Sequence, residues 1–229
     1  MINENIDLDL IKKDYTKNGY VRIEKFFNEE YVKKIANSIF NEISWDLCYL
    51  SDSGPISIKE AELKTYTAQQ SSELNQKIMS RAQQGFSYYY YRSDLVNSVN
   101  KVLKIFYKDL SGDEFIDFCR ELTGENSIDN VNGQLACYSP GCFLRKHTDE
   151  TNKENRVAAY VINFTPQWNN DWGGNLHILD KQHQIVKTLD PLFNSISIFK
   201  VPTLHYVSQV ANYARGKRFT ATGWMLMPD

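Results

Sequence analysis

The sequence predicts a mainly β protein with flanking helices, because its two parts differ in pattern. From about residue 131 onward, short runs rich in β-branched and aromatic residues alternate with turn signals such as those at 139–141 and 168–174. Many short strands separated by turns are typical of a sandwich or barrel rather than a parallel α/β sheet. The earlier residues mix short strands with helices, and no repeat or flexible linker intervenes. We therefore expect one domain over 1–229, with 1–130 as a mixed helical support region and 131–229 as the core.

The first elements are read from the spacing of apolar residues. Residues 19–23 alternate and are β-branched, which predicts a strand. Residues 28–43 carry apolar side chains at helical spacing, with Asn28 as the expected N-cap. Residues 56–84 are polar, and we interpret them as helical.

The segment 111–124 gives the clearest helix signal. Ser111 and Glu114 match a capping box, in which the hydroxyl and the carboxylate bind backbone N–H groups at the helix start. Gly124 suits the left-handed residue that ends many helices. Six strands are expected after this helix, at 133–138, 156–165, 174–179, 195–201, 205–210 and 218–226.

Composition and charge exclude several classes of function. The net charge of −2 provides no basic surface for nucleic acid or for an anionic membrane. The sequence starts without a secretory signal pattern, and no apolar run approaches the length of a membrane span. The cysteines form no C-x-x-C pair, which is typical of free thiols in a reducing cytosol, although Cys137 and Cys142 lie close enough in sequence for a disulfide across a turn. We expect a cytoplasmic protein with neither nucleic-acid nor membrane partners.

The heptapeptide LRKHTDE at 144–150 raises the question of a metal site. Side chains two positions apart lie on the same face of a strand, so His147 and Asp149 would point into one cavity. A His-x-Asp pair alone is weak evidence, since a polar turn contains the same residue types. His205, on another expected strand, supplies a second imidazole. Two imidazoles and one carboxylate make the facial triad suited to non-haem Fe(II).

A basic residue follows in the last expected strand. Arg218 inside a barrel would need an anionic partner, because an unpaired buried charge is costly. A ligand carboxylate such as that of 2-oxoglutarate can bind a guanidinium through two hydrogen bonds. Thr220 shares the strand face of Arg218 and would add a hydroxyl. By itself, Arg218 is better interpreted as a surface arginine in the basic run 214–218.

The order of these motifs resembles the Fe(II)/2-oxoglutarate-dependent dioxygenases of the prolyl-hydroxylase-like group, which includes ribosomal-protein prolyl hydroxylases. The similar stretch runs from about Gln134 to Trp224, with a Gly-Gly turn after a tryptophan and an Arg-x-Thr-x-Thr-Gly-Trp ending. The resemblance implies a double-stranded β-helix (jelly-roll) core with Fe(II) and O₂, and 2-oxoglutarate as cosubstrate. It also implies hydroxylation of an unactivated C–H bond of a prolyl or other amino-acid-derived substrate.

The same resemblance assigns the metal ligands. His147, Asp149 and His205 match the residues that bind iron and form the catalytic centre. Related halogenases have a small residue in place of the carboxylate, where chloride binds the iron. Because Asp149 is present here, hydroxylation or a variant such as desaturation is favoured over halogenation.

Three further residues match positions that contact the cosubstrate. Arg218 matches the basic residue that binds the distal carboxylate of 2-oxoglutarate, and Tyr138 and Thr220 match hydroxyl groups beside it. The interval between His205 and Arg218 is longer than the family pattern suggests. Arg215 therefore remains an alternative anchor.

Several residues outside this set carry two interpretations. The aromatic segment 85–95 either packs on the barrel or lines the substrate entrance, with Arg92 free for an anionic group. Trp168 and Trp172 either cover the substrate or fix their turn. His177 and His183 complete no ligand set, and we leave both out of the metal site. His177 lies in an expected strand, where its side chain faces either the pocket or the outside.

Other classes of function remain open at this level. The substrate is a peptide, a free amino acid or a small metabolite, which makes a tailoring oxygenase the alternative within the same chemistry. A jelly-roll binding or sensor module would keep the ligands without turnover. A zinc hydrolase also uses two histidines and a carboxylate, but its chemistry does not require an arginine that binds a dicarboxylate.

Overall fold

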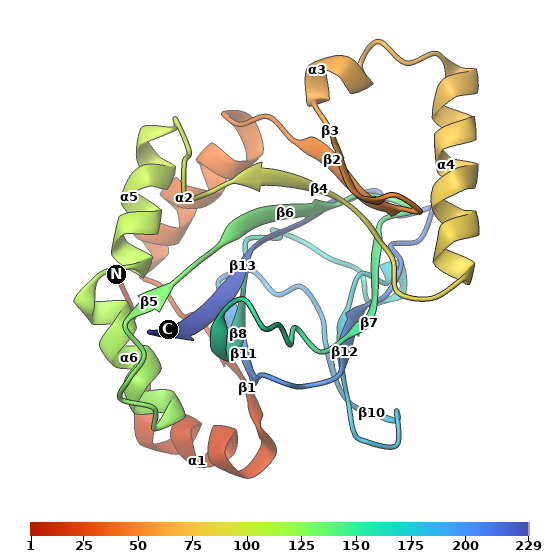
Figure 1. Cartoon of the computed structure of the whole chain (residues 1–229). Helices are drawn as coiled ribbons and strands as arrows, with labels where there is room; N and C mark the ends of the chain where they lie inside the picture. Colours follow the sequence, from red (N-terminus) through yellow and green to blue (C-terminus); the bar gives the residue numbers. More distant parts are fainter. Residues whose placement is uncertain (229) are drawn as a thin grey trace.

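The strands of this protein pair into one sheet that curls into a nearly closed barrel, as the computed structural model of residues 1–228 shows (Figure 1). The strands in chain order are β1 (Tyr20–Glu24), β2 (Asp46–Ser51), β3 (Gly54–Ile58), β4 (Tyr88–Asp94), β5 (Asn130–Val131), β6 (Gln134–Tyr138), β7 (Phe143–His147), β8 (Asn155–Asn163), β9 (Leu176–Leu179), β10 (Ile185–Leu189), β11 (Ser195–Lys200), β12 (His205–Val207) and β13 (Arg218–Met227). The helices are α1 (Leu8–Asn18), α2 (Glu29–Asn41), α3 (Glu60–Leu63), α4 (Ala68–Gln83), α5 (Lys101–Leu110) and α6 (Asp113–Thr123), with a short 3-10 helix at Asn170–Trp172.

The pairing order explains how the barrel closes. The main path runs β1-β11-β8-β13-β6-β4-β7-β12-β9-β10. Strand β4 pairs with β6 through its second half and with β7 through its first half, so it joins the two sides of the barrel. The pairs along this path are antiparallel. The prediction of a mainly β fold with flanking helices around a jelly-roll core is confirmed.

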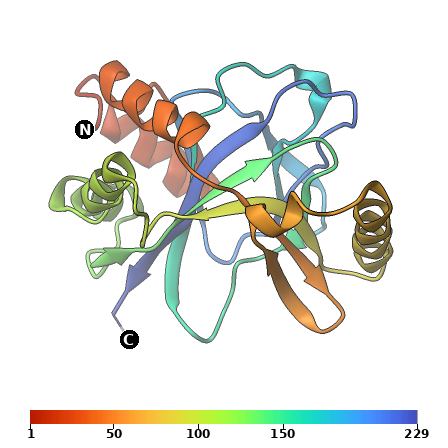
Figure 2. The ribbon, with the colours of Figure 1, turned by 90° about the horizontal axis from the view of Figure 1, so that it is seen from above.

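Helices cover the outer face of the barrel on two sides. Helices α1, α2, α5 and α6 gather on one side, and α4 stands on the opposite side (Figures 1 and 2). The buried side chains of Phe106 in α5 and Phe115 in α6 pack on Phe164 and Tyr160, with ring centroids 5.7 and 5.8 Å apart. This apolar layer fixes the helices on the barrel, since burial of large aromatic side chains dominates core energetics.

Alternation along the two central strands separates a packing face from a site face. In β8, Tyr160 and Ile162 belong to the core beneath the helices, while Ala159 and Val161 belong to a second cluster inside the barrel. In β13, every second residue from Arg218 to Trp224 faces an internal cavity. Successive strand side chains point to opposite faces, so the sequence of each strand builds the core and the site together.

The capping box expected at 111–114 is wrong. The N-cap of α6 is Gly112, without a side-chain hydrogen bond, and Ser111 is instead the C-cap of α5. The Glu114 carboxylate accepts hydrogen bonds from the amino group of Met1 and the backbone N–H of Ile2. A distant partner has displaced the local one. The helix end agrees with expectation, since Gly124 is left-handed with φ of 75°.

Other local predictions are met in part. Strand β1 and helix α2 lie where they were expected, with Asn28 as the N-cap but without a side-chain hydrogen bond. The range 56–84 contains the end of β3 and two helices rather than one helix. Helices α1 and α5 were not expected, and strands β1 and β4 from the first region pair directly with strands of the second.

Two absences bear on the expectations above. The cysteines are free and buried, so Cys137 and Cys142 form no disulfide. Within residues 1–228, no helix combines the length and apolar character that a bilayer crossing requires.

Candidate active site

The two histidines of the expected triad meet across a strand pair. Strands β7 and β12 are antiparallel neighbours with His147 opposite His205, and their ring centroids lie 4.1 Å apart. The Asp149 carboxylate lies 3.1 Å from Nε2 of His147 and 3.4 Å from Nε2 of His205. One ligand atom from each residue lies within 4.8 Å of the others. The structure therefore brings the three predicted ligands together.

Backbone carbonyls orient both imidazoles. The Nδ1 atom of His147 lies 2.9 Å from the carbonyl oxygen of Arg145, and Nδ1 of His205 lies 2.8 Å from that of Thr203. A carbonyl only accepts, so Nδ1 donates in each ring, and Nε2 of a neutral ring then carries the lone pair. Both lone pairs point toward the carboxylate, an arrangement that a bound cation would stabilise. Metal-binding histidines commonly donate their second nitrogen in this way.

The charges of the triad suit a cation as well. Burial lowers the pKa of His205 to about 4, with His147 acting in the same direction, so the ring is neutral at pH 7. Burial raises the pKa of Asp149, but contacts with His147 and His205 outweigh it and hold that pKa below its ordinary value. A metal needs deprotonated ligands, and both of these shifts favour the deprotonated form.

Asp149 reaches the site by a different route from the one expected. Strand β7 ends at His147, and Asp149 has a left-handed backbone with φ of 62°, so strand alternation does not place its side chain. Arg156 donates from Nη1 to the carbonyl oxygen of Asp149 at 2.9 Å. The same guanidinium binds Glu154 at 2.8 Å and lies 3.6 Å from the ring centroid of Trp224. A left-handed non-glycine residue is uncommon, and this bond supports it.

Arg218 lies inside the barrel without a charged partner. Its side chain is 3% exposed, its Nε has no hydrogen-bond partner, and among residues 1–228 no carboxylate lies within ion-pair distance. Burial lowers the pKa of the guanidinium. An isolated buried cation is costly without an anion. Arg215, the alternative anchor, is exposed and lies outside the cavity.

The two expected hydroxyl residues lie beside Arg218. Tyr138 is opposite Arg218 in the β6–β13 register, and the guanidinium lies 5.0 Å from the centroid of its ring. Burial raises the pKa of Tyr138, so its hydroxyl stays protonated and can donate. Thr220 is 1% exposed and donates to the carbonyl oxygen of Ala136 at 3.5 Å.

A single internal cavity of about 230 Å³ connects these groups. Its lining includes all the predicted site residues, namely His147, Asp149, His205, Arg218, Tyr138 and Thr220. Sequence reasoning missed Arg156, Gln134 and Trp224 as lining residues. Trp224 shares the alternating face of Arg218, so the period of the strand could have identified it. Arg156 carries no comparable signal.

The aromatic segment 85–95 both lines the cavity and packs on the outside of the barrel. Tyr88 and Tyr90 line the cavity, and Tyr90 stacks on Tyr138 with ring centroids 5.3 Å apart. Tyr89 points to the other face of β4, where it packs on Phe143. Arg92 is exposed and lines a different hollow, so it does not face the cavity.

The remaining candidates lie outside the cavity. Trp168 packs edge-on against Trp172 and donates to the carbonyl oxygen of Gly173, which fixes their turn. His177 contacts Thr188 and stacks on the ring of Tyr206, away from the metal ligands. Leaving His177 out of the triad therefore agrees with its position.

Comparisons with known proteins give a consistent result. Residues 133–226 match the family model of the 2OG-Fe(II) oxygenase superfamily. The chain is 31% identical over 125 residues to prolyl 3-hydroxylase OGFOD1 of Mus musculus, covering 50% of this chain and 22% of the relative. The corresponding protein of Xenopus laevis is 31% identical over 120 residues, covering 48% and 23%. The chain thus spans less than a quarter of the length of these relatives.

Solved structures share the fold. The prolyl-4-hydroxylase of Pseudomonas putida matches with a TM-score of 0.63 and 13% identity, covering 97% of this chain and 100% of the other. A Trichoplax adhaerens prolyl hydroxylase, solved with a peptide fragment of hypoxia inducible factor, matches with a TM-score of 0.63 and 17% identity, covering 96% and 89%. The matched family model over residues 133–226 and the shared fold together support a prolyl-hydroxylase-like 2OG-Fe(II) oxygenase.

Proposed function

We propose that this protein is an Fe(II)/2-oxoglutarate-dependent oxygenase that hydroxylates an unactivated C–H bond of a prolyl or other amino-acid-derived substrate. One observation carries the proposal: a buried arginine without a counterion faces the same cavity as a His-Asp-His cluster. A zinc hydrolase would explain the cluster but not Arg218. An Fe(II) centre with a dicarboxylate cosubstrate explains both the His-Asp-His cluster and Arg218.

Each residue then has a defined task. His147, Asp149 and His205 would hold Fe(II), with two imidazoles and one carboxylate as the donor set. When bound, iron with 2-oxoglutarate and O₂ supplies the oxidation that converts a C–H bond into C–OH, with succinate and CO₂ as co-products. The protein orients the reactants and excludes water.

The cosubstrate is oriented by the opposite wall. Arg218 binds its distal carboxylate, and the hydroxyl groups of Tyr138 and Thr220 add hydrogen bonds. Because Arg218 is already buried, its attraction for a carboxylate is screened less than it would be at the surface. Tyr88 and Tyr90 form the apolar wall between this anchor and the entrance.

The wider assignment rests on supporting observations. Strands from both sequence regions pair in the sheet, which supports one functional domain over 1–229. Free buried thiols support a cytoplasmic location, since such compartments keep cysteines reduced. The net charge of −2 supports a partner set without nucleic acid or membrane. OGFOD1 is named a prolyl 3-hydroxylase, which supports a prolyl substrate here.

Spectroscopy and product analysis test the proposal. Anaerobic addition of Fe(II) and 2-oxoglutarate to metal-free protein should give a weak visible charge-transfer band, which O₂ removes with release of succinate. Mass spectrometry of a treated lysate should then find a product heavier by one oxygen atom. A band without succinate under any substrate mixture indicates a binding or sensor module instead. A free metabolite as the only oxidised product indicates a tailoring oxygenase.

A further inference from the structure

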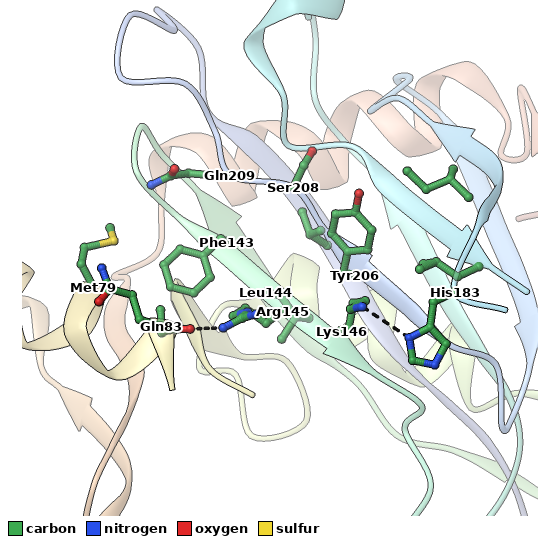
Figure 3. A pocket seen from close by; sticks show the side chains of 14 residues that line it. Met79, Gln83, Phe143, Leu144, Arg145, Lys146, His183, Tyr206, Ser208 and Gln209 are labelled. Carbon is green, nitrogen blue, oxygen red and sulfur yellow. Dashed lines mark hydrogen bonds between the residues drawn. The ribbon is translucent and has the colours of Figure 1, made fainter. Parts of the chain in front are cut away.

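A second hollow lies on the outside of the barrel, between the C-terminal half of α4 and strands β7 and β12 (Figure 3). Its volume is about 790 Å³, and it opens broadly to solvent. His205 lines the internal cavity and the next residue, Tyr206, lines the hollow, while Leu144 and Val207 border both. We call this hollow the α4 groove and define it by Met79, Ala82, Gln83, Phe143–Lys146 and Tyr206–Gln209, together with Leu179, His183 and Ile185.

The α4 groove has a one-sided charge. Lys146 and Arg145 line it, and no Asp or Glu does. The Lys146 ammonium lies 3.5 Å from Nδ1 of His183 (Figure 3) and has no carboxylate partner among the described residues. A turn holds His183 in place, because its backbone N–H donates to Asp180. The exposed end of the groove thus carries a lysine cation that can attract an anionic group.

The other end of the α4 groove adjoins the internal cavity, because Leu144 and Val207 line both. Gln83 lines the groove, and Phe86, three residues later, lines the cavity with its ring 5.5 Å from that of His147. The backbone N–H of Arg145 donates to the carbonyl oxygen of Ser87 at 2.9 Å, and Arg145 also donates to the carbonyl oxygen of Ala82. The segment joining α4 to β4 is therefore fixed against β7, with the groove on one side and the metal ligands on the other.

We propose that the α4 groove binds an extended, acidic segment of a polypeptide substrate while the reacting residue of that substrate enters the internal cavity. This inference rests on the proposed function and names its substrate class. The cavity of about 230 Å³ is smaller than typical ligand sites of roughly 300–1,000 Å³, so it suits the cosubstrate and one side chain. A free amino acid would leave the α4 groove without a role, whereas a polypeptide must continue outside the cavity.

The groove surface fits such a segment. The side chains of Phe143, Tyr206 and Met79 provide apolar contacts (Figure 3). The cationic pair Lys146 and Arg145 favours Asp or Glu in the segment, since complementary charge mainly determines specificity and association rate. The preferred substrate is therefore a flexible polypeptide with acidic residues on one side of the target residue.

Direct binding tests the groove separately from turnover. The probes are three fluorescent peptides with one central proline and acidic, neutral or basic flanking residues on both sides, measured by anisotropy with the full chain. We expect the acidic peptide to bind tightest. For the variant Lys146→Glu, the Kd of the acidic peptide should rise about tenfold. The preference for acidic over neutral flanking residues should disappear. The matched control Lys181→Glu changes an exposed lysine outside the groove and should bind like the wild type.

A second variant and a spectroscopic readout keep the outcomes distinct. His183→Glu places the reversed charge at the same end of the groove but on a turn remote in sequence from the metal ligands, and it should also weaken acidic-peptide binding. All three variants should keep the anaerobic Fe(II)/2-oxoglutarate band. If the wild type gives no band, the proposed function is wrong. The peptide affinities measured by anisotropy then test the groove proposal by themselves. If the band is intact and peptides of all three charges bind equally to wild type and Lys146→Glu, the groove proposal is wrong.

Discussion

Replacing Arg218 by Met should weaken 2-oxoglutarate binding while leaving the unliganded protein at least as stable as the wild type. The two effects have a common cause. The guanidinium is 3% exposed and has no carboxylate partner in the described chain. The folded protein thus carries the desolvation cost of this cation; the ring of Tyr138 lies beside the guanidinium, and a ligand carboxylate would supply the missing negative charge. Methionine is apolar and of similar volume, so it removes the charge with little change in packing.

The size of each effect follows from its environment. Breaking a buried ion pair by removing one partner costs about 3–5 kcal/mol, so the Kd for 2-oxoglutarate should rise by about two to three orders of magnitude. Replacement of buried charges by apolar residues is often neutral or stabilising by about 1–4 kcal/mol. At a concentration one hundred times its Kd, a ligand stabilises the wild type by about 2.7 kcal/mol. For a chain of this size that raises Tm by roughly 5–10 °C.

Thermal unfolding with and without 2-oxoglutarate measures both effects in one experiment. The wild type should gain several degrees, whereas Arg218→Met should gain less than about 2 °C at the same concentration and should unfold no lower than the wild type without ligand. Arg215→Met is the matched control, because Arg215 is exposed and lies outside the cavity. An unchanged ligand shift in Arg218→Met, or a loss of the shift in Arg215→Met, would refute the assignment of the anchor.

Three further changes test the site and its surroundings. Asp149→Ala should reduce succinate formation at least about 100-fold, since even loss of a supporting contact costs 10–100-fold in metal affinity; wild-type turnover in that variant, or an equal loss in the exposed neighbour Glu150→Ala, would remove Asp149 from the ligand set. Arg156→Leu removes the bond to the carbonyl of Asp149 and should weaken Fe(II) binding by about 10–100-fold, measured by titrating the visible band; unchanged affinity in folded protein would contradict a positioning role. Burial raises the pKa of Cys142 to about 11 and that of Cys137 to about 12, so above pH 9 the unfolded thiols lose protons that the folded ones keep. Urea unfolding should show stability falling by about 1.4 kcal/mol per pH unit for each thiol from about pH 9 to 11, and Cys142→Ala should reduce that slope; an unchanged slope would mean that Cys142 does not titrate differently in the two states.

The β core was predictable because its strands follow a simple alternation. Residues 156–165 and 218–226 were expected as strands and form β8 and β13 within two residues at each end. Their inner and outer faces both follow from period 2. The helices were harder, since α1 has only one buried residue, Tyr15, and so carries little apolar periodicity. Such a helix depends on tertiary contacts rather than on a pattern in its own sequence.

The site was predictable as a set of residues but not as a geometry. His205 and Arg218 lie on strands β12 and β13, as the sequence predicted. Asp149 lies in a left-handed turn after β7, and its support comes from Arg156, which reaches back from β8. The Glu114 carboxylate shows the same limit, because Met1 and Ile2 rather than the start of α6 are its partners. Contacts between residues distant in sequence decide both cases, and no local pattern encodes them.

The two buried charges of the cavity explain why the barrel keeps both its metal ligands and its arginine. Asp149 lies in the turn after β7 and Arg218 lies on β13, and the two side chains form no ion pair. If they paired, each would satisfy the other and the cavity would attract neither a cation nor an anion. Because the turn after β7 and strand β13 keep them apart, Asp149 requires a positive partner and Arg218 a negative one. A divalent metal at the triad and a dianionic 2-oxoglutarate at the arginine supply both, and with them the four charges in the cavity cancel. The separation of these two residues is therefore the electrostatic condition for binding metal and cosubstrate together.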